Sequence, residues 1–389
     1  LMMQLSREGI GYGIYLLLSA SGFGMNEITT RMAENLKTVF TLELTDKYKY
    51  VDALRTTNIS VLPEAGVHGR GLAKYNGECL EYQTALMNNG EDDYSRAKEA
   101  EELFRVMREN WDGATARKIP QIPHNPVYSA FSQTDEFRKA LRNRRIPVGY
   151  NTETADVFSL DLSELYSYLI LGQSHSGKTN VLQLLMNAVS EMDKSRIVLY
   201  SKNNKYLKDY AEKKGAAVLS DSKSVFEFFK ELTPVFVERN KEKNRLIGEG
   251  LVEKELFESM QKYEPLFIFV DDLEAFFTDV YEPGEGVGKM SGFIENILDK
   301  GQLHNIYFFG SMNAGSITFA SRFKGFSCFN KDRKGMLLST SVSSQRLLDF
   351  GKISFNEGNA VPENGIALTQ LSEGNKHSLC KTVLPIAGR

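Results

Sequence analysis

The chain has 389 residues, of which 42% are hydrophobic and 25% are charged. This length suits about two ordinary domains, and the composition is typical of a protein with well-buried cores. The 47 basic and 50 acidic residues leave a net charge of −3, so no overall field attracts the protein to nucleic acid or anionic lipid. Cys79, Cys328 and Cys380 are few and far apart, which argues against a disulfide framework or a zinc site.

The first residue is leucine, and the residues after it lack the pattern of a signal peptide. No stretch reaches the roughly 18 consecutive apolar residues that a membrane-spanning helix requires. Because the chain does not begin with methionine, we expect it to be a piece of a longer polypeptide.

Residues 1–90 are expected to form a small α/β region. The apolar run at 14–18 predicts a buried strand, and a second strand is expected over 38–44. A helix is expected over 47–54, and Gly69 begins a predicted hairpin that returns through Cys79.

Residues 91–145 are expected to connect this region to the rest of the chain. A helix is predicted over 91–111, and packing on a neighbouring domain explains its apolar stripe better than a dedicated partner site does. Three prolines between residues 120 and 126 predict an extended linker. A solvated helix end explains the basic run at 138–145 more simply than a phosphate-binding patch does.

The densest functional signal lies at 169–179, where an apolar run meets a candidate phosphate-binding loop. The loop consists of Gly172, Gln173, Ser174, His175, Ser176, Gly177, Lys178 and Thr179. This is the complete P-loop pattern of a glycine, four variable residues and Gly-Lys-Thr. The apolar run predicts a strand before the loop, and apolar residues predict a helix after it, which is the context that the motif requires.

Each residue type in this loop has a chemical reason. Gly172 and Gly177 let successive backbone N–H groups converge on the β- and γ-phosphates of a nucleotide, where a Cβ would collide. Lys178 would place an ammonium group on the same oxygens, and the Thr179 hydroxyl can ligate Mg²⁺. The start of the following helix also favours an anion. The predicted cofactors are therefore ATP and Mg²⁺, with a purely structural glycine-rich turn as the alternative.

Strands and helices alternate after the loop. Strands are expected over 196–201 and 217–220, and helices over 205–214 and 223–240. This alternation predicts an α/β fold with a mainly parallel sheet that is covered on both faces.

A second nucleotide signal follows the apolar run at 266–270. Asp271 and Asp272 stand at the end of this predicted strand, where ligands bind in parallel sheets. Asp271 would hold Mg²⁺ through its water shell, and Asp272 is the candidate that orients the attacking water. An acidic turn after a core strand is the alternative, but the two motifs together predict a P-loop NTPase more strongly than either does alone.

Further candidate residues follow the carboxylates. Asn313 ends the next predicted strand, where a polar side chain can sense the γ-phosphate, and an ordinary strand-ending turn explains it nearly as well. Arg322, Arg333 and Arg346 are candidates for an arginine finger that acts on a neighbouring subunit, although surface positions explain them more simply.

The end of the chain also repeats the order of its beginning. Three pairs of segments match in order and spacing: 14–21 with 306–313, the helix at 47–54 with a helix expected over 343–350, and 70–73 with 364–367. If the repeat is real, residues 1–90 are the C-terminal half of an ATPase module whose P-loop half lies upstream. Coincidence is the alternative, because the identities are sparse.

The whole pattern resembles the FtsK/SpoIIIE ATPase family, and within it the EssC/EccC coupling ATPases of type VII secretion. The resemblance rests on Ile-Pro-Val-Gly at 146–149, the P-loop, Phe-Ile-Phe-Val-Asp-Asp at 267–272, Ser-Met-Asn at 311–313 and Asn-Gly-Ile-Ala at 364–367. It implies a terminal RecA-like P-loop module over 146–389, preceded by a helical, proline-containing linker over 91–145 and by half of a similar module over 1–90.

By this resemblance, the full protein would be anchored in the bacterial membrane through upstream segments, with these modules on the cytoplasmic side. It would recognise small helical WxG-motif substrates, lie beside further ATPase modules of the same polypeptide and assemble into a homo-hexamer. DNA-pumping relatives usually have glutamine at the position of Asn313, and Asp272 reaches one methylene less far than glutamate would. These departures leave turnover open while nucleotide binding is expected.

Two alternative functions stay open. A double-stranded DNA translocase would need a basic channel lining, which the balanced charge disfavours. A nucleotide-bound docking platform for secretion substrates would keep the same site without hydrolysing ATP.

Overall fold

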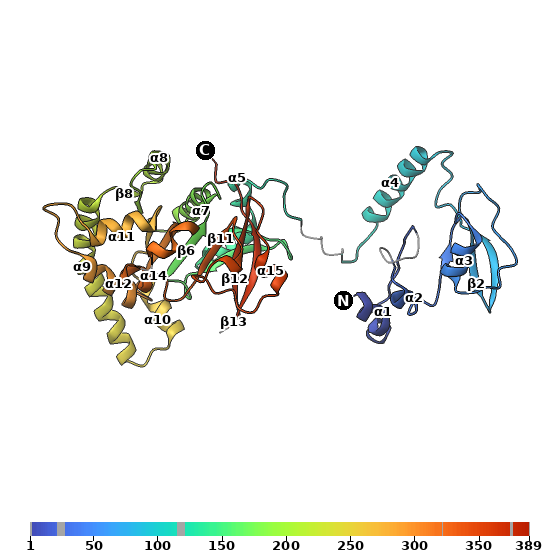
Figure 1. Cartoon of the computed structure of the whole chain (residues 1–389). Helices are drawn as coiled ribbons and strands as arrows, with labels where there is room; N and C mark the ends of the chain where they lie inside the picture. Colours follow the sequence, from blue (N-terminus) through green and yellow to red (C-terminus); the bar gives the residue numbers. More distant parts are fainter. Residues whose placement is uncertain (1, 22–27, 115–120, 321, 374–375, 389) are drawn as a thin grey trace. The chain divides into compact units, whose positions relative to one another are not determined.

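A computed structural model of the chain describes residues 2–21, 28–114, 121–320, 322–373 and 376–388 (Figure 1). The chain divides into two compact units, residues 1–116 (unit 1) and residues 117–389 (unit 2). Across the described ranges, no helix combines the length and the apolar composition that a bilayer crossing requires.

Unit 1 is built on a three-stranded antiparallel sheet in the order β1-β2-β3. Its described elements are α1 (Met2–Glu8), α2 (Thr30–Ala33), β1 (Phe40–Thr41), α3 (Lys47–Leu54), β2 (Arg70–Tyr75), β3 (Glu78–Gln83) and α4 (Asp93–Glu109). The predicted hairpin is confirmed as β2 and β3, and the predicted helices at 47–54 and 91–111 are confirmed as α3 and α4. A small core unites α3 with this sheet; its buried members are Tyr50, Leu54, Ile59, Leu72 and Cys79.

The predicted strand at 14–18 is wrong. Residues 14–20 form neither helix nor strand, and Leu17 is fully exposed. A strand is stable when neighbouring strands satisfy its backbone groups. Among the described residues, none pairs with this segment as a strand, so its apolar composition alone does not make it one.

The strands of unit 2 form one sheet in the order β5-β4-β13-β12-β11-β6-β10-β9-β7-β8. The pairings from β11 to β8 are parallel, and those from β5 to β11 are antiparallel. Their bounds are β4 (Arg145–Asn151), β5 (Val157–Asp161), β6 (Ser167–Gly172), β7 (Arg196–Tyr200), β8 (Ala217–Leu219), β9 (Leu266–Val270), β10 (Ile306–Asn313), β11 (Gly335–Leu338), β12 (Ile366–Glu373) and β13 (Lys376–Val383). This confirms the predicted α/β class with its mainly parallel sheet.

Helices cover both faces of this sheet, because its central strands are continuous apolar runs that are buried on both sides (Figure 1). Phe309 joins the core that contains α7 and α8, whereas its neighbour Phe308 joins the core that contains α9, α11, α12 and α14. The helices of unit 2 are α5 (Tyr128–Phe131), α6 (Asp135–Arg142), α7 (Lys178–Ser190), α8 (Lys205–Lys213), α9 (Ser222–Gly248), α10 (Glu253–Met260), α11 (Leu273–Tyr281), α12 (Ser291–Lys300), α13 (Ile317–Ala320), α14 (Lys324–Phe329) and α15 (Phe355–Asn359).

The helix predicted over 343–350 is also wrong. Only a short 3-10 turn forms there, at Val342–Ser344. The Gln345 side chain accepts hydrogen bonds from the backbone N–H groups of Leu347 (2.7 Å) and Leu348 (2.8 Å). A side chain that bonds its own following backbone offers these groups an alternative to the helix.

Candidate nucleotide-binding site

The P-loop joins β6 to α7 in the conformation that its glycines allow. Gly177 precedes the first residue of α7 with a φ of 95°, in the left-handed region that favours glycine. A Cβ on Gly172 would lie 2.4 Å from Ser176 Oγ and 2.9 Å from Leu338 Cβ. The backbone therefore passes too close to its surroundings at Gly172 for any larger residue.

Lys178 and Ser176 both have polar groups that suit a phosphate ligand. The Lys178 ammonium donates to the carbonyls of Gly172 (3.1 Å) and Gln173 (2.6 Å), so it lies over the loop. Burial lowers the pKa of Lys178, while the charges of Asp271 and Asp272 oppose that shift. Within the described chain, the buried Ser176 hydroxyl has no hydrogen-bond partner. A buried polar group is costly without a partner, so a ligand with oxygen acceptors would complete this loop.

Asn313 reaches the P-loop because β10 lies directly between β6 and β9 in the sheet. In the parallel register Asn313 pairs with Gly172. Its amide nitrogen donates to Ser174 Oγ at 3.0 Å, and its amide oxygen accepts from the Gly315 N–H at 2.9 Å. The structure therefore joins two predicted site residues that are far apart in the sequence.

Asp271 follows β9 and is half-buried. Its carboxylate accepts a hydrogen bond from Ser201 Oγ at 3.1 Å, and its backbone carbonyl accepts one from the Ser311 hydroxyl. Burial raises the pKa of Asp271, and the bond from Ser201 counteracts that shift. Sequence reasoning missed Ser201; the signal was its position directly after β7, the strand beside β9.

Asp272 has a structural role that its motif did not predict. It is the N-cap of α11, and its Oδ1 accepts from the backbone N–H groups of Glu274 (2.9 Å) and Ala275 (3.3 Å). Capping side chains of this kind satisfy the unpaired N–H groups at a helix start. One oxygen of the predicted water-orienting carboxylate therefore already has partners.

The donor set fits a magnesium nucleotide. Thr179 lies in the first turn of α7 and Asp271 at the end of β9, and hydroxyl and carboxylate oxygens are the ligands that Mg²⁺ prefers. The glycine-containing loop directly before the start of α7 suits phosphate oxygens.

Two of the candidate finger arginines have ion-pair partners on the surface. Arg322 pairs with Glu282 at 3.2 Å, and Arg333 lies 3.8 Å from Asp349 and donates to the carbonyl of Arg346. A finger role for any of these arginines stays a prediction.

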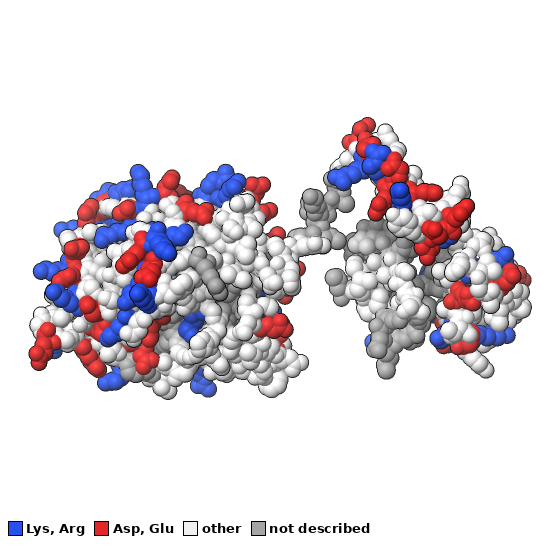
Figure 2. Space-filling view, turned by 90° about the horizontal axis from the view of Figure 1, so that it is seen from above, with Lys and Arg blue, Asp and Glu red and all other residues white. Residues whose placement is uncertain are grey.

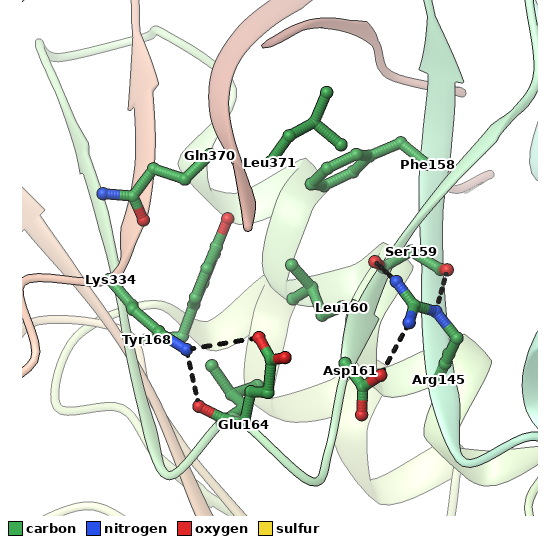
Figure 3. Close-up of a pocket in the computed structure, with 11 residues that line it drawn as sticks. Arg145, Phe158, Ser159, Leu160, Asp161, Glu164, Tyr168, Lys334, Gln370 and Leu371 are labelled. Carbon is green, nitrogen blue, oxygen red and sulfur yellow. Dashed lines mark hydrogen bonds and ion pairs between the residues drawn. The ribbon is translucent and has the colours of Figure 1, made fainter. Parts of the chain in front are cut away.

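A separate small pocket of about 100 Å³ lies where β6 and β11 begin, at the opposite strand ends from the P-loop (Figure 3). Its charged groups are paired: Arg145 with Asp161 at 2.6 Å, and Lys334 with the Glu164 carbonyl at 2.7 Å. It contains none of the predicted site residues, so the candidate site is the P-loop end of the sheet.

Comparisons with known proteins agree with this geometry. No family model matches the chain. The chain is 23% identical over 347 residues to the ESX secretion system protein EccC of Geobacillus thermodenitrificans. This match covers 89% of the chain and 22% of that relative, so the chain spans about a fifth of its length.

Solved structures share the fold. EssC (ATPases 2 and 3) from Geobacillus thermodenitrificans matches 99% of the chain and 67% of its own length, with a TM-score of 0.69 and 20% identity. Thermomonospora curvata EccC (ATPases 2 and 3), solved in complex with a signal sequence peptide, matches 98% of the chain and 64% of its own length, with a TM-score of 0.54 and 19% identity.

The fold and the assembled motifs are those of an α/β protein with a P-loop at the end of a parallel strand. The homologues of this chain are the EccC/EssC ATPases of type VII secretion, which confirms the resemblance seen in the sequence.

Proposed function

We propose that unit 2 binds Mg-ATP and serves as an ATPase module of a type VII secretion motor. The observation that carries this proposal is the meeting of four sequence signals at one end of the sheet. The P-loop, Asp271, Asp272 and Asn313 lie at the ends of three adjacent strands, and Asn313 bonds directly to Ser174.

In this proposal each group has one task. The backbone N–H groups of residues 173–179 bind the phosphate oxygens, and Lys178 neutralises the charge on the β- and γ-phosphates. Thr179 and Asp271 hold Mg²⁺, with Ser201 orienting the Asp271 carboxylate. Asn313 contacts the γ-phosphate, and its hydrogen bond to Ser174 connects that contact to the P-loop.

Slow hydrolysis would use Asp272 to orient water. Because Oδ1 of Asp272 caps α11, Oδ2 is the oxygen that would face a water molecule. Because Asp272 also serves as a helix cap, it is less free to orient water. This favours a second candidate function, a nucleotide-bound docking platform with little or no turnover. The two functions differ in turnover and share the same binding site.

The partners and placement are proposed from the homologues. One solved EccC is described in complex with a signal sequence peptide. We propose by analogy that the whole protein recognises small helical WxG-motif substrates on the cytoplasmic side of the bacterial membrane. Further ATPase modules of the same polypeptide, membrane anchoring upstream and a homo-hexamer belong to this proposal, as does the division into 1–90, 91–145 and 146–389.

The surface view bears on the DNA-translocase alternative. On the face of unit 2 drawn in Figure 2, basic and acidic side chains are interspersed. A DNA channel needs a continuous basic lining, because phosphate contacts supply most of the affinity for DNA. DNA-stimulated ATPase activity that falls steeply with salt would support the translocase instead.

The test measures Mg-ATP binding to the full chain by titration calorimetry, comparing wild type with Lys178→Ala. Loss of the ammonium should cost about 3 kcal/mol, roughly two decades in Kd. The matched control is Lys334→Ala, which removes a lysine at the opposite strand ends and should leave Kd unchanged. Equal Kd values for wild type and Lys178→Ala would overturn the proposed binding site.

Turnover of the same samples separates the two functions. Phosphate release that Lys178→Ala abolishes supports a working motor, whereas tight binding without release supports the docking platform.

A further inference from the structure

The segment 384–387, which we name the strap, is bonded to the P-loop helix through two asparagines. Asn187, further along α7, donates to the Ala387 carbonyl at 3.4 Å, and Asn180 bonds the strap at the start of the helix. Asn180 is the residue directly after Thr179 in α7. Its amide nitrogen donates to the Pro385 carbonyl at 2.9 Å, and its amide oxygen accepts from the Ala387 N–H at 2.9 Å. Because the planar amide makes both bonds at once, the strap and the first turn of α7 are held in one fixed arrangement.

The other side of the strap is bonded to the segment that enters unit 2. Ile386 donates its N–H to the Pro126 carbonyl at 2.8 Å and accepts from the Tyr128 N–H at 2.9 Å. These bonds form a short parallel bridge between Val127 and Ile386. The strap therefore lies between α7 and residues 126–128, which lie near the start of unit 2 and within the predicted linker.

A second bond ties the entry segment to the far end of α7. The Tyr128 hydroxyl donates to the Glu191 carboxylate at 2.6 Å, and Glu191 is the C-cap of α7. Residues 126–128 are thus attached to both ends of the P-loop helix, directly at its end and through the strap at its start. The helix between them is rigid, since residues 181–189 are all buried.

The strap is buried at Leu384, Pro385 and Ala387 and is exposed only at Ile386. Val127 is 43% exposed and Ile386 is 56% exposed, and a cavity of about 500 Å³ opens beside them. The bonds of Ile386 to Pro126 and Tyr128 can therefore open while Leu384 and Ala387 stay in the core, which is what a low-energy local opening requires.

We propose that Asn180 is a positioning residue that couples nucleotide occupancy of the P-loop to residues 126–128 through the strap. This inference rests on the proposed nucleotide binding. A bound phosphate fixes Lys178 and Thr179, which lie in the same helical turn as Asn180, and so narrows the positions that the Asn180 amide can take. The strap and residues 126–128 are then held more firmly, so the opening of their hydrogen bonds depends on whether nucleotide is bound.

Hydrogen exchange of the full chain, followed by mass spectrometry with and without Mg-ATP, tests this coupling. In wild type, Mg-ATP should slow exchange of the Tyr128 and Ile386 amides by about tenfold, the equivalent of one hydrogen bond. In Asn180→Ala this slowing should disappear, while residues 172–179 stay protected by Mg-ATP.

Two further variants make the result specific. Asn180→Asp keeps the acceptor for Ala387 and loses the donor to Pro385, so it should show an intermediate response. Asn330→Ala is the matched control: it loses a bond of 2.9 Å to the Leu347 carbonyl elsewhere in unit 2 and should respond like wild type.

The outcomes separate this inference from the proposed function. Full slowing of the Tyr128 and Ile386 amides in Asn180→Ala, or no slowing there in a wild type whose P-loop is protected, overturns the coupling. An unprotected P-loop in wild type overturns nucleotide binding instead. The role of Asn180 in holding the strap is then tested without nucleotide. Asn180→Ala should still speed exchange of the Tyr128 and Ile386 amides by about tenfold, and equal rates in wild type and variant would reject that role.

Discussion

Two apolar segments that the predicted repeat matches lie in opposite environments. Phe309 of β10 is buried completely in unit 2, and its counterpart in that predicted repeat, Leu17 of unit 1, is fully exposed. The difference between them is their neighbours, because β10 lies between β6 and β9 whereas residues 14–20 pair with no described strand. An apolar run of this kind becomes a strand when a neighbouring strand pairs with it.

The hydrophobic cores of the two units also differ in size. Unit 2 has large apolar clusters on both faces of its sheet, whereas the core of unit 1 is a handful of residues around Tyr50 and Leu72. Exposed apolar side chains gather at the start of unit 1, among them Tyr12, Tyr15 and Leu17.

The largest expected effect is on stability at the matched positions. Phe309→Ala should lower the free energy of unfolding of unit 2 by about 3–5 kcal/mol, because it leaves a cavity beside the stacked ring of Phe269. Leu17→Ala should change the stability of unit 1 by less than about 0.5 kcal/mol. Urea unfolding followed by pulsed hydrogen exchange measures both. Comparable losses would show that Leu17 is packed in solution and would break the comparison.

A buried histidine should also make unit 2 lose stability in mild acid. His304 is fully buried and stacks on Phe236 with ring centres 4.7 Å apart. Burial lowers the pKa of His304 to about 4. Its neutral form therefore stabilises unit 2 fully above pH ~6.5, the usual histidine pKa, and about 3 kcal/mol is lost as the pH falls towards 4.

The measurement is the unfolding free energy of unit 2 between pH 7 and pH 4. In His304→Gln the slope of stability with pH should flatten, although the variant is less stable at pH 7 because contacts to Gln302 and Asn240 change. The control is His68→Gln, an exposed histidine of unit 1, which should leave the slope unchanged. An unchanged slope in His304→Gln would assign the acid sensitivity to other groups.

The sequence predicted those features that depend on local pattern. The continuous apolar runs of β6 and β9 specify buried parallel strands, and the P-loop specifies its own glycines and flanking elements. Its failures were at 14–18 and 343–350, where a strand lacks partners and where Gln345 bonds the backbone that a helix needs.

The missing parts of the site depend on which strands become neighbours. Ser201 reaches Asp271 only because β7 lies beside β9, and Asn180 meets the strap across more than 200 residues of sequence. Asn313 was predicted for a γ-phosphate role, but its bond to Ser174 follows from the register of β10 on β6. Such contacts can be predicted only when the order of strands in the sheet is known, and the periodicity of apolar residues in the sequence does not determine that order.

The smallest expected effect is the loss of stability when a helix-capping aspartate is replaced. One such aspartate in each unit lets the capping role of Asp272 be separated from a role in hydrolysis. Asp46 caps α3 by accepting from the Lys49 N–H at 3.0 Å, and Asp272 caps α11. Asp46→Ala and Asp272→Ala should each cost about 1 kcal/mol in their own unit. Asparagine caps helices as well as aspartate does, so Asp272→Asn should keep stability within a few tenths of a kcal/mol.

Phosphate release then decides what else Asp272 does. If its free oxygen orients water, Asp272→Asn should bind Mg-ATP as tightly as wild type and lose turnover, since the amide no longer accepts the proton. Asp46→Asn should leave both quantities unchanged. Wild-type turnover in Asp272→Asn would reduce Asp272 to a helix cap, and the two aspartates would then be equivalent despite their different units.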